Sequence, residues 1–430
     1  MHNRAAHQRS FWRRYVTVWL LVLFSLNSFG LAAFATDDTS VVSTSTMEGR
    51  LAVFDDVWET IFERYYDPSL NGVDWQKRRL SYRVAAAKAT GTSELYDVLR
   101  QLIAPLNDAH TRVYSPEEKF DWWSPRFVTT GISVREVEGA PTVVGVDKNS
   151  QAAKIGIRAG DVILSIDSKP VNEVVKQNTQ HARSRNASRS FSGLLDGPAG
   201  SSVLIAWKDR DGKLRTATLQ RYWSQRQLSF SSERKDKIVT IKLDAFTQVV
   251  VADFLQALPG MIKDMKGIIL DLRGNGGGDA EAMADVASLF LKDGINLGRF
   301  ADRSGASFEL QTYFKRIWRL PLTSQIELPL VVITSENTSS ASEILVAALQ
   351  TSKRAEIIGK DTCGCVLAIR NRHSLPDGGV LDVSEFDYRT AQGVRLEGRG
   401  IKTDRVVSLR RRDLYDRRDT ALETAKSLLK

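Results

Sequence analysis

Apolar residues recur at helical spacing over residues 48–105. In the segment LAVFDDVWETIFERYY they return every third or fourth position and define one apolar face. The segment SELYDVLRQLIAPL repeats this pattern and stops near Pro105, since a proline breaks a continuing helix. We predict an N-terminal helical module over residues 48–122, which includes the polar sequence LNDAHTRV. The face expected to be buried comprises Leu51, Phe54, Val57, Trp58, Ile61 and Phe62.

The pattern changes to short strands and turns from Phe127 onward. The segments TTGISVREVEG and APTVVGVDKNS alternate or run apolar over a few residues, which is typical of strands. A short helix, a glycine turn and another strand follow in QAAKIGIRAGDVILSIDSKPV. The segment GPAGSSVLIAWKDRDGKLRTATLQR closes as a hairpin. These elements predict a β-rich domain over residues 123–224.

Apolar strands alternate with helical segments from Ile238 to the C-terminus. The expected strands are KIVTIKLDAF, KGIILDLRGN, LPLVVITS and RAEIIGK. The expected helices are VVADFLQALPGMIKDM, AEAMADVASLFL, SASEILVAALQTS and the terminal DTALETAKSLLK. Such alternation predicts an α/β layer architecture with a largely parallel sheet over residues 225–430. The expected fold class is therefore multi-domain α/β.

Residues 1–35 have the parts of a secretory signal peptide. Four arginines precede the apolar stretch YVTVWLLVLF, and the small-residue sequence AFA ends at Ala35. An uncleaved membrane anchor is the alternative, but the stretch is short for a span and is broken by Asn27 and Gly30. The polar segment 36–47 is interpreted as a tether. We expect an exported protein of the periplasm or cell envelope.

Net charge limits the partners. The formal net charge is +9, and loss of the four arginines in residues 1–35 leaves +5, which is mild for 430 residues. Nucleic-acid binding would need a dense basic stripe, so no nucleic-acid partner is expected. The richest basic run, residues 395–418, also contains three aspartates and is interpreted as solvated surface, with peripheral contact to an anionic membrane as the alternative. The oligomeric state stays open.

The two cysteines, Cys363 and Cys365, are separated by one residue. Two thiols without neighbouring histidines do not make a zinc site, so no metal is expected. An exported protein meets oxidising conditions, in which a bridge can form. A bridge across one residue would be strained and more reducible than a structural disulfide.

Two loops carry candidate chemistry. The segment DLRGNGGG, residues 271–278, leaves an apolar strand, and its glycines allow backbone N–H groups to approach an oxyanion; a simple tight turn is the alternative. No phosphate-loop sequence is present, which argues against a nucleotide cofactor. Ser340 and Glu343 in SSASEI fit a helix capping box, whereas a nucleophile at a helix start is the second interpretation.

The β-rich segment resembles a PDZ domain. The resemblance rests on TGI at residues 130–132 and on SQAAKIGIRAGDVILSID at residues 150–167. In such domains a peptide C-terminus adds as a strand, and loop N–H groups hold its carboxylate. The resemblance places Gly131 and Ile132 at that groove. A PDZ domain that only packs against its neighbour and gates it is the alternative.

Together, these segments resemble the C-terminal-processing (tail-specific) protease family and its tricorn-like relatives. The helical module ending in DAHT, the PDZ segment, DLRGNGGG and TSSASEI occur in the family's order from about residue 48 onward. The resemblance implies a ClpP/crotonase-like core and a serine peptidase that needs no cofactor and cuts protein or peptide substrates, with their C-termini as a recognition element. It implies Ser340 as nucleophile and the N–H groups of Gly277 and Ala341 as oxyanion donors.

The chain departs from the best-known branch of the family, which uses a Ser–Lys dyad. The lysine position, 25 residues after the serine, is Cys365 here, and the following glutamine position is Ile369. Lys360 lies five residues before that position. Cys365 is interpreted as half of a bridge, as a free thiol lining the site or, least favoured, as a nucleophile without a base.

In the tricorn-like branch a histidine acts as the base and a glutamate orients it. The matching residues are His110 in NDAHTR and Glu397 in LEGRGIKTD. A neutral imidazole can accept the serine proton while a carboxylate fixes its tautomer. The alternatives are a structural His110 and a surface Glu397 paired with arginine. His373 is the second candidate base, and His181 is interpreted as solvated.

Three functions remain in competition. The first is an exported serine endopeptidase with a Ser340–His110–Glu397 triad and a PDZ domain that recruits or gates substrate. The second is an inactive pseudoprotease that serves as a peptide-binding scaffold, which the lysine-to-cysteine difference at residue 365 motivates. A carrier of apolar ligands rests only on the tolerance of the fold.

Overall fold

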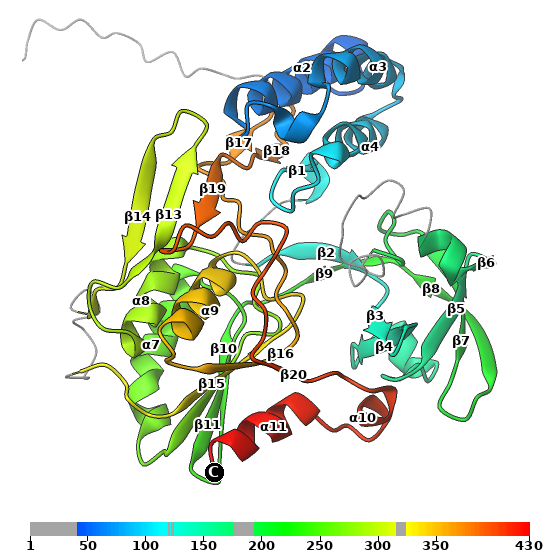
Figure 1. Cartoon of the computed structure of the whole chain (residues 1–430). Helices are drawn as coiled ribbons and strands as arrows, with labels where there is room; N and C mark the ends of the chain where they lie inside the picture. Colours follow the sequence, from blue (N-terminus) through cyan, green and yellow to red (C-terminus); the bar gives the residue numbers. More distant parts are fainter. Residues whose placement is uncertain (1–40, 119–120, 122–123, 176–192, 315–323) are drawn as a thin grey trace, which may run out of the picture. The chain divides into compact units, whose positions relative to one another are not determined.

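The computed structural model describes residues 41–118, 121, 124–175, 193–314 and 324–430 (Figure 1). The expected signal peptide, the first part of the tether and His181 lie outside these ranges. The chain divides into the units 1–41 and 42–430, and everything below concerns the second. Among the described residues, no helix combines the length and apolarity needed to cross a bilayer.

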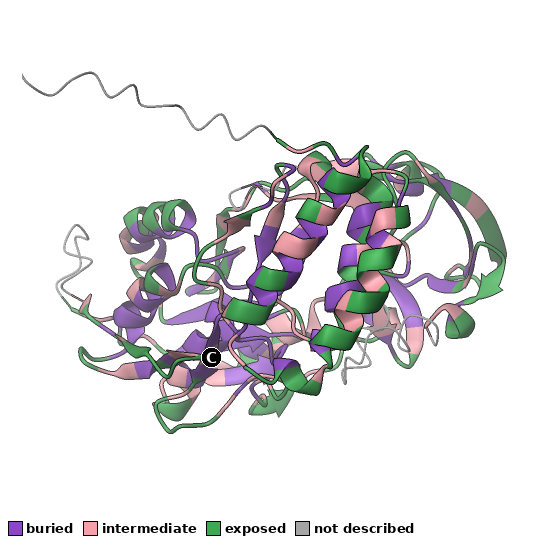
Figure 2. Cartoon of the chain, turned by 90° about the horizontal axis from the view of Figure 1, so that it is seen from above, coloured by how far each residue is buried: buried purple, intermediate pink, exposed green. Residues whose placement is uncertain are grey.

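The helices 47–64 and 92–103 each bury one face, whereas the helix 75–88 buries only Trp75 and Ala86; buried residues are purple in Figure 2. Phe54, Val57 and Ile61 have no exposed area, as predicted. Phe62 is 42% exposed, because it follows Ile61 by about 100° of helical rotation and lies past the edge of the apolar face. Thr46 begins the first helix by accepting a hydrogen bond from the Gly49 N–H. The helices are α2 (Met47–Arg64), η1 (Leu70–Gly72), α3 (Trp75–Lys88), α4 (Thr92–Ile103) and η2 (Ala104–Leu106).

The core of this helical module is completed by residues from the C-terminal half of the chain. Leu375, Leu381 and Val383 pack among the apolar side chains of α2 to α4. A small sheet of order β1-β18-β17 makes the connection, with Val113 opposite Leu381 in an antiparallel pair. The strands are β1 (Arg112–Tyr114), β17 (His373–Ser374) and β18 (Val380–Asp382), and the short helix η3 (Pro116–Glu118) follows β1.

The second domain is a β-rich fold around its own apolar core. Its sheet has the order β3-β4-β5-β7-β8, with β6 beside β5, and it buries residues such as Val143, Ile163 and Ile205. The chain enters and leaves this domain through an antiparallel ribbon of β2 and β9. The elements are β2 (Arg126–Thr129), β3 (Ile132–Val137), β4 (Ala140–Val146), α5 (Gln151–Lys154), β5 (Val162–Ile166), β6 (Lys169–Pro170), β7 (Ser202–Lys208), β8 (Leu214–Gln220) and β9 (Tyr222–Gln225).

The third domain contains a six-stranded sheet of order β10-β11-β12-β15-β16-β20, in which only the β10–β11 pair is antiparallel. This confirms the predicted largely parallel sheet and the multi-domain α/β class. The strands are β10 (Phe230–Lys235), β11 (Ile238–Leu243), β12 (Gly267–Asp271), β15 (Leu330–Thr334), β16 (Glu356–Gly359) and β20 (Arg405–Val406). A second sheet joins β14 (Ser307–Gln311), β13 (Asn296–Asp302) and β19 (Phe386–Arg389).

Both faces of the main sheet are covered, which explains its continuous apolar strands. Ile268 and Leu270 pack with the layer formed by α7 to α9, whereas Ile269 between them faces α11 and Ala425. Since β12 and β15 are parallel neighbours, the segments that follow them emerge at the same edge of the sheet. The helices are α7 (Gln248–Ile262), α8 (Ala280–Phe290), α9 (Ala341–Thr351), α10 (Arg411–Tyr415) and α11 (Thr420–Leu428).

Candidate active site

The glycine-rich loop after β12 and the serine loop after β15 are joined by hydrogen bonds. The carbonyl of Asn275 accepts from the Ser339 N–H at 3.2 Å and from the Ser342 hydroxyl at 3.1 Å. The Ser339 hydroxyl donates to the Gly276 carbonyl at 3.0 Å. The hydroxyl of Thr338 donates to the Leu272 carbonyl directly after β12. The two candidate loops therefore form one unit at the carboxyl edge of the sheet.

Ser340 has a backbone conformation that non-glycine residues seldom adopt, with φ 57° and ψ −126°. It is the N-cap of α9, and the Glu343 side chain supplies the returning half of the predicted capping box, whereas the Ser340 hydroxyl accepts no cap hydrogen bond. The helix start is held through the backbone instead, because the Glu343 N–H donates to the Ser340 carbonyl at 2.8 Å and the Ser340 N–H donates to Glu343 Oε2 at 3.1 Å. A strained residue at a strand-to-helix turn is typical of a positioned nucleophile rather than of a capping serine.

Gly277 lies directly against Ser340. Its φ is +97°, and a Cβ there would be 2.6 Å from the Ser340 Cβ and 2.9 Å from the Ala341 nitrogen. The structure thus brings Ser340 together with both expected oxyanion donors. The Gly277 N–H donates to Asn275 Oδ1 at 2.9 Å, and Asn275 is fully buried. An oxyanion at Gly277 would have to replace that amide oxygen.

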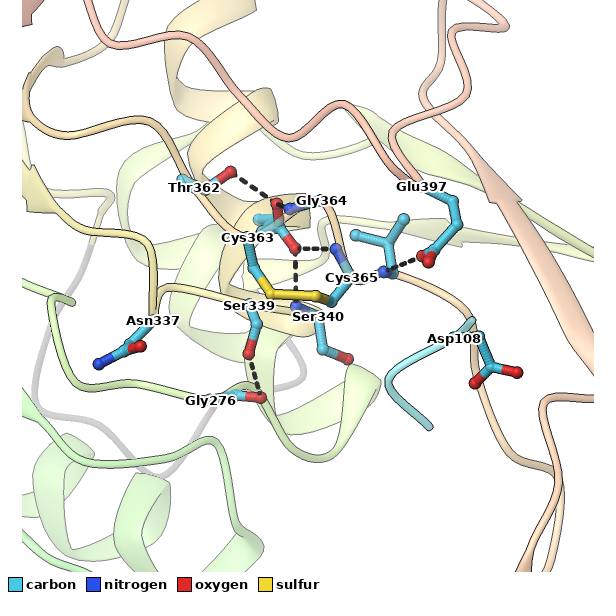
Figure 3. Close-up of a disulfide and its surroundings, with 12 residues drawn as sticks. Asp108, Gly276, Asn337, Ser339, Ser340, Thr362, Cys363, Gly364, Cys365 and Glu397 are labelled. Atoms are coloured by element: carbon cyan, nitrogen blue, oxygen red, sulfur yellow. Dashed lines mark hydrogen bonds between the residues drawn. A yellow bond between two sulfur atoms is a disulfide. The ribbon is translucent and has the colours of Figure 1, made fainter. Parts of the chain in front are cut away.

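Cys363 and Cys365 form a disulfide, so the interpretation of Cys365 as a free thiol is wrong. The bridge lies beside Ser340 (Figure 3). The Ser340 N–H donates to the Cys365 carbonyl at 2.8 Å. Cys365 occupies the position of the lysine in the Ser–Lys branch. It therefore contributes a carbonyl acceptor and neither a base nor a free thiol.

The carboxylate of Glu343 holds this loop in place through hydrogen bonds. It is fully buried and accepts hydrogen bonds from the Thr362 hydroxyl at 2.6 Å, the Gly364 N–H at 2.7 Å and the Cys365 N–H at 2.9 Å, in addition to that of Ser340. Burial raises the pKa of Glu343, and the donors oppose this by favouring the charged form. Glu343 therefore fixes both sides of the Ser340 turn.

Glu397 holds the next residues of the same loop. Its Oε2 accepts from the Val366 N–H at 2.7 Å and the Leu367 N–H at 3.2 Å. Burial raises its pKa to about 7, with the charges of Asp108 and Glu343 acting in the same direction and the two N–H groups opposing. Glu397 is half-buried and its carboxylate is bound to the loop backbone, so its contacts go beyond those of a surface charge paired with arginine.

The loop that carries His110 comes to the Glu397 end of the site. Asp108 Oδ1 accepts from the His110 N–H at 2.8 Å, the Thr111 N–H at 2.7 Å and the Ser384 hydroxyl at 2.8 Å. The charge of Asp108, two residues before His110, contributes to the raised pKa of Glu397. In Figure 3, Asp108 and Glu397 are drawn beyond Cys365 as seen from Asn337.

His373, the alternative base, belongs to the helical module. Its Nε2 lies 2.8 Å from Asp56 Oδ2 on α2 and 3.4 Å from the Thr60 hydroxyl. An acidic partner on another element gives this histidine a structural role, so its interpretation as the second candidate base is not supported by its contacts. His181 lies outside the described residues.

The expected peptide-binding loop is closely packed. Gly131 has φ +83°, and a Cβ there would lie 2.4 Å from the Ser150 Cβ. Ile132 is 8% exposed and begins β3, which pairs only with β4 among the described strands. Further along β3, Arg135 Nη1 lies 3.8 Å from Glu336 Oε1, close to the start of the serine loop. Among the described strands, β3 therefore leaves one edge unpaired, and its Arg135 lies near the start of the serine loop.

Asn275, Thr362 and Asp108 are site residues that sequence reasoning missed. Each of them is a polar residue inside or beside a recognised segment. No spacing in the sequence indicates which hydrogen bonds it makes. Among the described residues, no group of three or more His, Cys, Asp or Glu side chains could hold a metal ion.

Three family models match the chain in the order of its domains. Peptidase family S41 matches residues 237–407, the tricorn protease C1 domain matches residues 48–104, and a PDZ domain matches residues 142–208. The solved photosystem II D1 C-terminal processing protease is 26% identical, with a TM-score of 0.55 over 88% of this chain and 97% of that chain. Mature CPAF, 14% identical with a TM-score of 0.64 over 89% of this chain and 96% of that chain, shares the fold.

Curated relatives agree with these matches. Carboxyl-terminal-processing peptidase 1, chloroplastic, of Arabidopsis thaliana is 28% identical over 384 residues, which cover 86% of this chain and 73% of that protein. Carboxy-terminal processing protease CtpA of Bacillus subtilis (strain 168) is 24% identical over 399 residues, 91% of this chain and 77% of that protein. Residues 237–407 match peptidase family S41, and the chain is a serine-type peptidase with a PDZ domain, similar to the C-terminal processing proteases.

The raised pKa of Glu397 predicts a pH-dependent stability. Between its ordinary value of 4.5 and about 7 the folded chain holds a proton at Glu397 that the unfolded chain has lost. The free energy of unfolding should therefore fall as pH rises through this window, by on the order of 3 kcal/mol from this group. Urea unfolding at pH 5, 6, 7 and 8 measures the slope. Glu397→Gln should flatten it, and an equal slope in both proteins would contradict the assignment.

Proposed function

We propose that the chain is an exported serine endopeptidase that cleaves protein or peptide substrates through an acyl-enzyme. Ser340 is the nucleophile, His110 the general base and Glu397 the residue that orients His110. The observation that carries the proposal is the strained Ser340 turn, pressed against Gly277 and without a side-chain cap bond. Since the Ser340 hydroxyl accepts no cap hydrogen bond, chemistry is the better explanation of this strained conformation.

In the proposed reaction the Ser340 Oγ attacks the scissile carbonyl while His110 takes its proton. The oxyanion is stabilised by the N–H groups of Ala341 and Gly277, the second of which must leave Asn275 Oδ1. His110 then gives the proton to the leaving amine, and water hydrolyses the ester by the same route in reverse.

Glu397 suits the orienting role. Its Oε2 is occupied by the Val366 and Leu367 N–H groups, and its Oε1 can accept from an imidazole N–H. Asp108 accepts a hydrogen bond from the His110 N–H and lies near enough to Glu397 for its charge to raise the pKa of Glu397. An ionised Glu397 stabilises the imidazolium that forms during attack, so activity is expected to rise as pH increases through about 7.

Substrate recruitment is assigned to the PDZ domain. The open edge of β3 can receive an extended peptide, and the Gly131–Ile132 turn at its start is the place for a terminal carboxylate. The similar proteins of Arabidopsis thaliana and Bacillus subtilis are C-terminal processing peptidases, which supports this choice of substrate end. Export is supported by the charged, apolar and AFA parts of residues 1–35.

An inactive, peptide-binding scaffold is the second candidate. It is favoured by the Gly277 N–H being bound to Asn275 and by a disulfide cysteine at the lysine position of the Ser–Lys branch. Both candidates share the PDZ groove, so they differ only in the chemistry at Ser340.

Cleavage of an unfolded protein by purified residues 36–430 tests the proposal. His110→Ala should lower kcat by at least about a thousandfold, because His110 is the proposed acceptor of the serine proton. The matched control is His373→Ala, which removes an imidazole bound to Asp56 and should keep kcat within a few-fold. Equal loss in both variants would contradict the triad. Binding of peptide C-termini without cleavage by the unmodified protein would favour the scaffold.

A further inference from the structure

One side of the Cys363–Cys365 bridge is bonded to the loop that presents Ser340. The Cys363 N–H donates to the Thr338 carbonyl at 3.0 Å, and the Cys365 carbonyl accepts from the Ser340 N–H at 2.8 Å. The two cysteines are thus the first and last residues of a short ring, and each contributes a backbone hydrogen bond to the serine loop. Figure 3 shows the ring beside Ser340.

The other side of the ring is bonded to the turn that carries Glu397. The carbonyl of Gly364, the residue between the cysteines, accepts from the Gly398 N–H at 2.9 Å. A Cβ on Gly364 would lie 2.8 Å from the backbone nitrogens of Arg399 and Gly400, so the tip of the ring touches this turn without free space. The disulfide therefore lies between the segments that hold two members of the proposed triad.

We infer that the Cys363–Cys365 disulfide is a redox switch, whose oxidised form holds Ser340 and Glu397 in register and whose reduction lowers peptidase activity. This inference rests on the proposed function of these two residues. Closing the ring removes conformational freedom from residues 363–365, and opening it returns that freedom to the backbone that both loops share. The hydrogen bonds with Glu343 remain available after reduction, so we expect a loosened site rather than an unfolded chain.

The chemistry of the switch is thiol–disulfide exchange with a small dithiol. A dithiol thiolate attacks one sulfur to give a mixed disulfide and releases the other cysteine as a thiolate, which takes up a proton. The second dithiol sulfur then closes its own disulfide and frees the remaining cysteine. Two electrons pass to the protein, which gains two thiols, and the dithiol is oxidised. Attack at Cys363 is favoured because it is 9% exposed and Cys365 only 2%.

The test compares the oxidised and the dithiothreitol-reduced forms of residues 36–430. Iodoacetamide labelling and intact mass should count no free thiol before reduction and two after it. We expect kcat to fall at least fivefold on reduction with KM changed less than twofold, and the rate of Ser340 labelling by a fluorophosphonate to fall in parallel. Reoxidation with glutathione disulfide should restore both rates. Two free thiols with unchanged kcat and labelling, or a bridge that resists reduction in the native protein, would overturn the inference.

The double variant Cys363→Ser/Cys365→Ser is the control. It should match the reduced protein in kcat and show no response to dithiothreitol; a response of the same size would assign the effect to another target. Hydrogen exchange of the amides near Ser340 and Glu397 provides a readout independent of cleavage. No Ser340-dependent cleavage in either redox state would defeat the proposed function, even if exchange near these residues is faster after reduction. Exchange that is equal in both states would defeat the proposed coupling itself.

Discussion

Ser340→Ala is expected to lower kcat by about 10³- to 10⁶-fold while leaving the thermal midpoint unchanged. The loss follows from removal of the nucleophile. The unchanged stability follows from the absence of a side-chain cap bond, since the helix start is held through the Ser340 backbone and Glu343. Cleavage of an unfolded protein and thermal unfolding of the same sample measure the two quantities.

The neighbouring Ser339 provides a matched control. Its hydroxyl donates to the Gly276 carbonyl, and Ser339→Ala should keep activity within about tenfold. If Ser340 were a capping residue, Ser340→Ala would instead cost about 1 kcal/mol and spare cleavage. That combination would contradict the nucleophile and support the scaffold.

Glu343→Ala is expected to destabilise the chain by about 3–5 kcal/mol and to abolish cleavage. Its carboxylate accepts four hydrogen bonds, and removing it leaves the donors of Ser340, Thr362, Gly364 and Cys365 without their acceptor in a fully buried place. Each unsatisfied buried donor costs about 1–3 kcal/mol, although water entering the cavity recovers part of this. Urea unfolding and Ser340-dependent cleavage measure the effects.

Two substitutions calibrate this result. Glu343→Gln keeps the volume and one acceptor oxygen, so its loss of stability should be smaller than that of Glu343→Ala. Glu423 occupies the first turn of α11 but is exposed and paired with Arg418, so Glu423→Ala should destabilise the chain much less than Glu343→Ala does. A similar loss in Glu343→Ala and Glu423→Ala would show that the buried acceptor is unimportant.

The main sheet was predictable because its strands are buried on both faces and separated by amphipathic helices. A strand that is buried on both faces, such as β12, carries a continuous apolar run and is therefore easy to recognise in the sequence. The β13–β14 hairpin and strands β17 to β20 were not predicted, since they are short or mix polar and apolar residues. The packing of Leu375 and Leu381 against α2 to α4 depends on a pairing across most of the chain, which local periodicity does not encode.

The candidate site was predictable as far as sequence motifs reach. The family resemblance identified Ser340 and Gly277, and the structure brings them into contact. The bond between Gly277 and Asn275 and the four donors around Glu343 could not be predicted, because such partners are set by tertiary placement. The state of Cys365 stayed open for the same reason, since a C-x-C spacing permits both a bridge and free thiols. The Ser340–His110–Glu397 triad itself stays a prediction.

The packing of residues 375–383 into the core of the helical module also sets an order of events during synthesis. The helices α2 to α4 are made early, yet part of the apolar layer that covers them is made more than 270 residues later. Until those late residues leave the ribosome, the early helices keep an incompletely covered apolar surface, and long-range contacts of this kind form slowly. A chain with this connectivity keeps its N-terminal helices incompletely packed until more than 370 residues have been made, because the residues that complete their core lie in its C-terminal half.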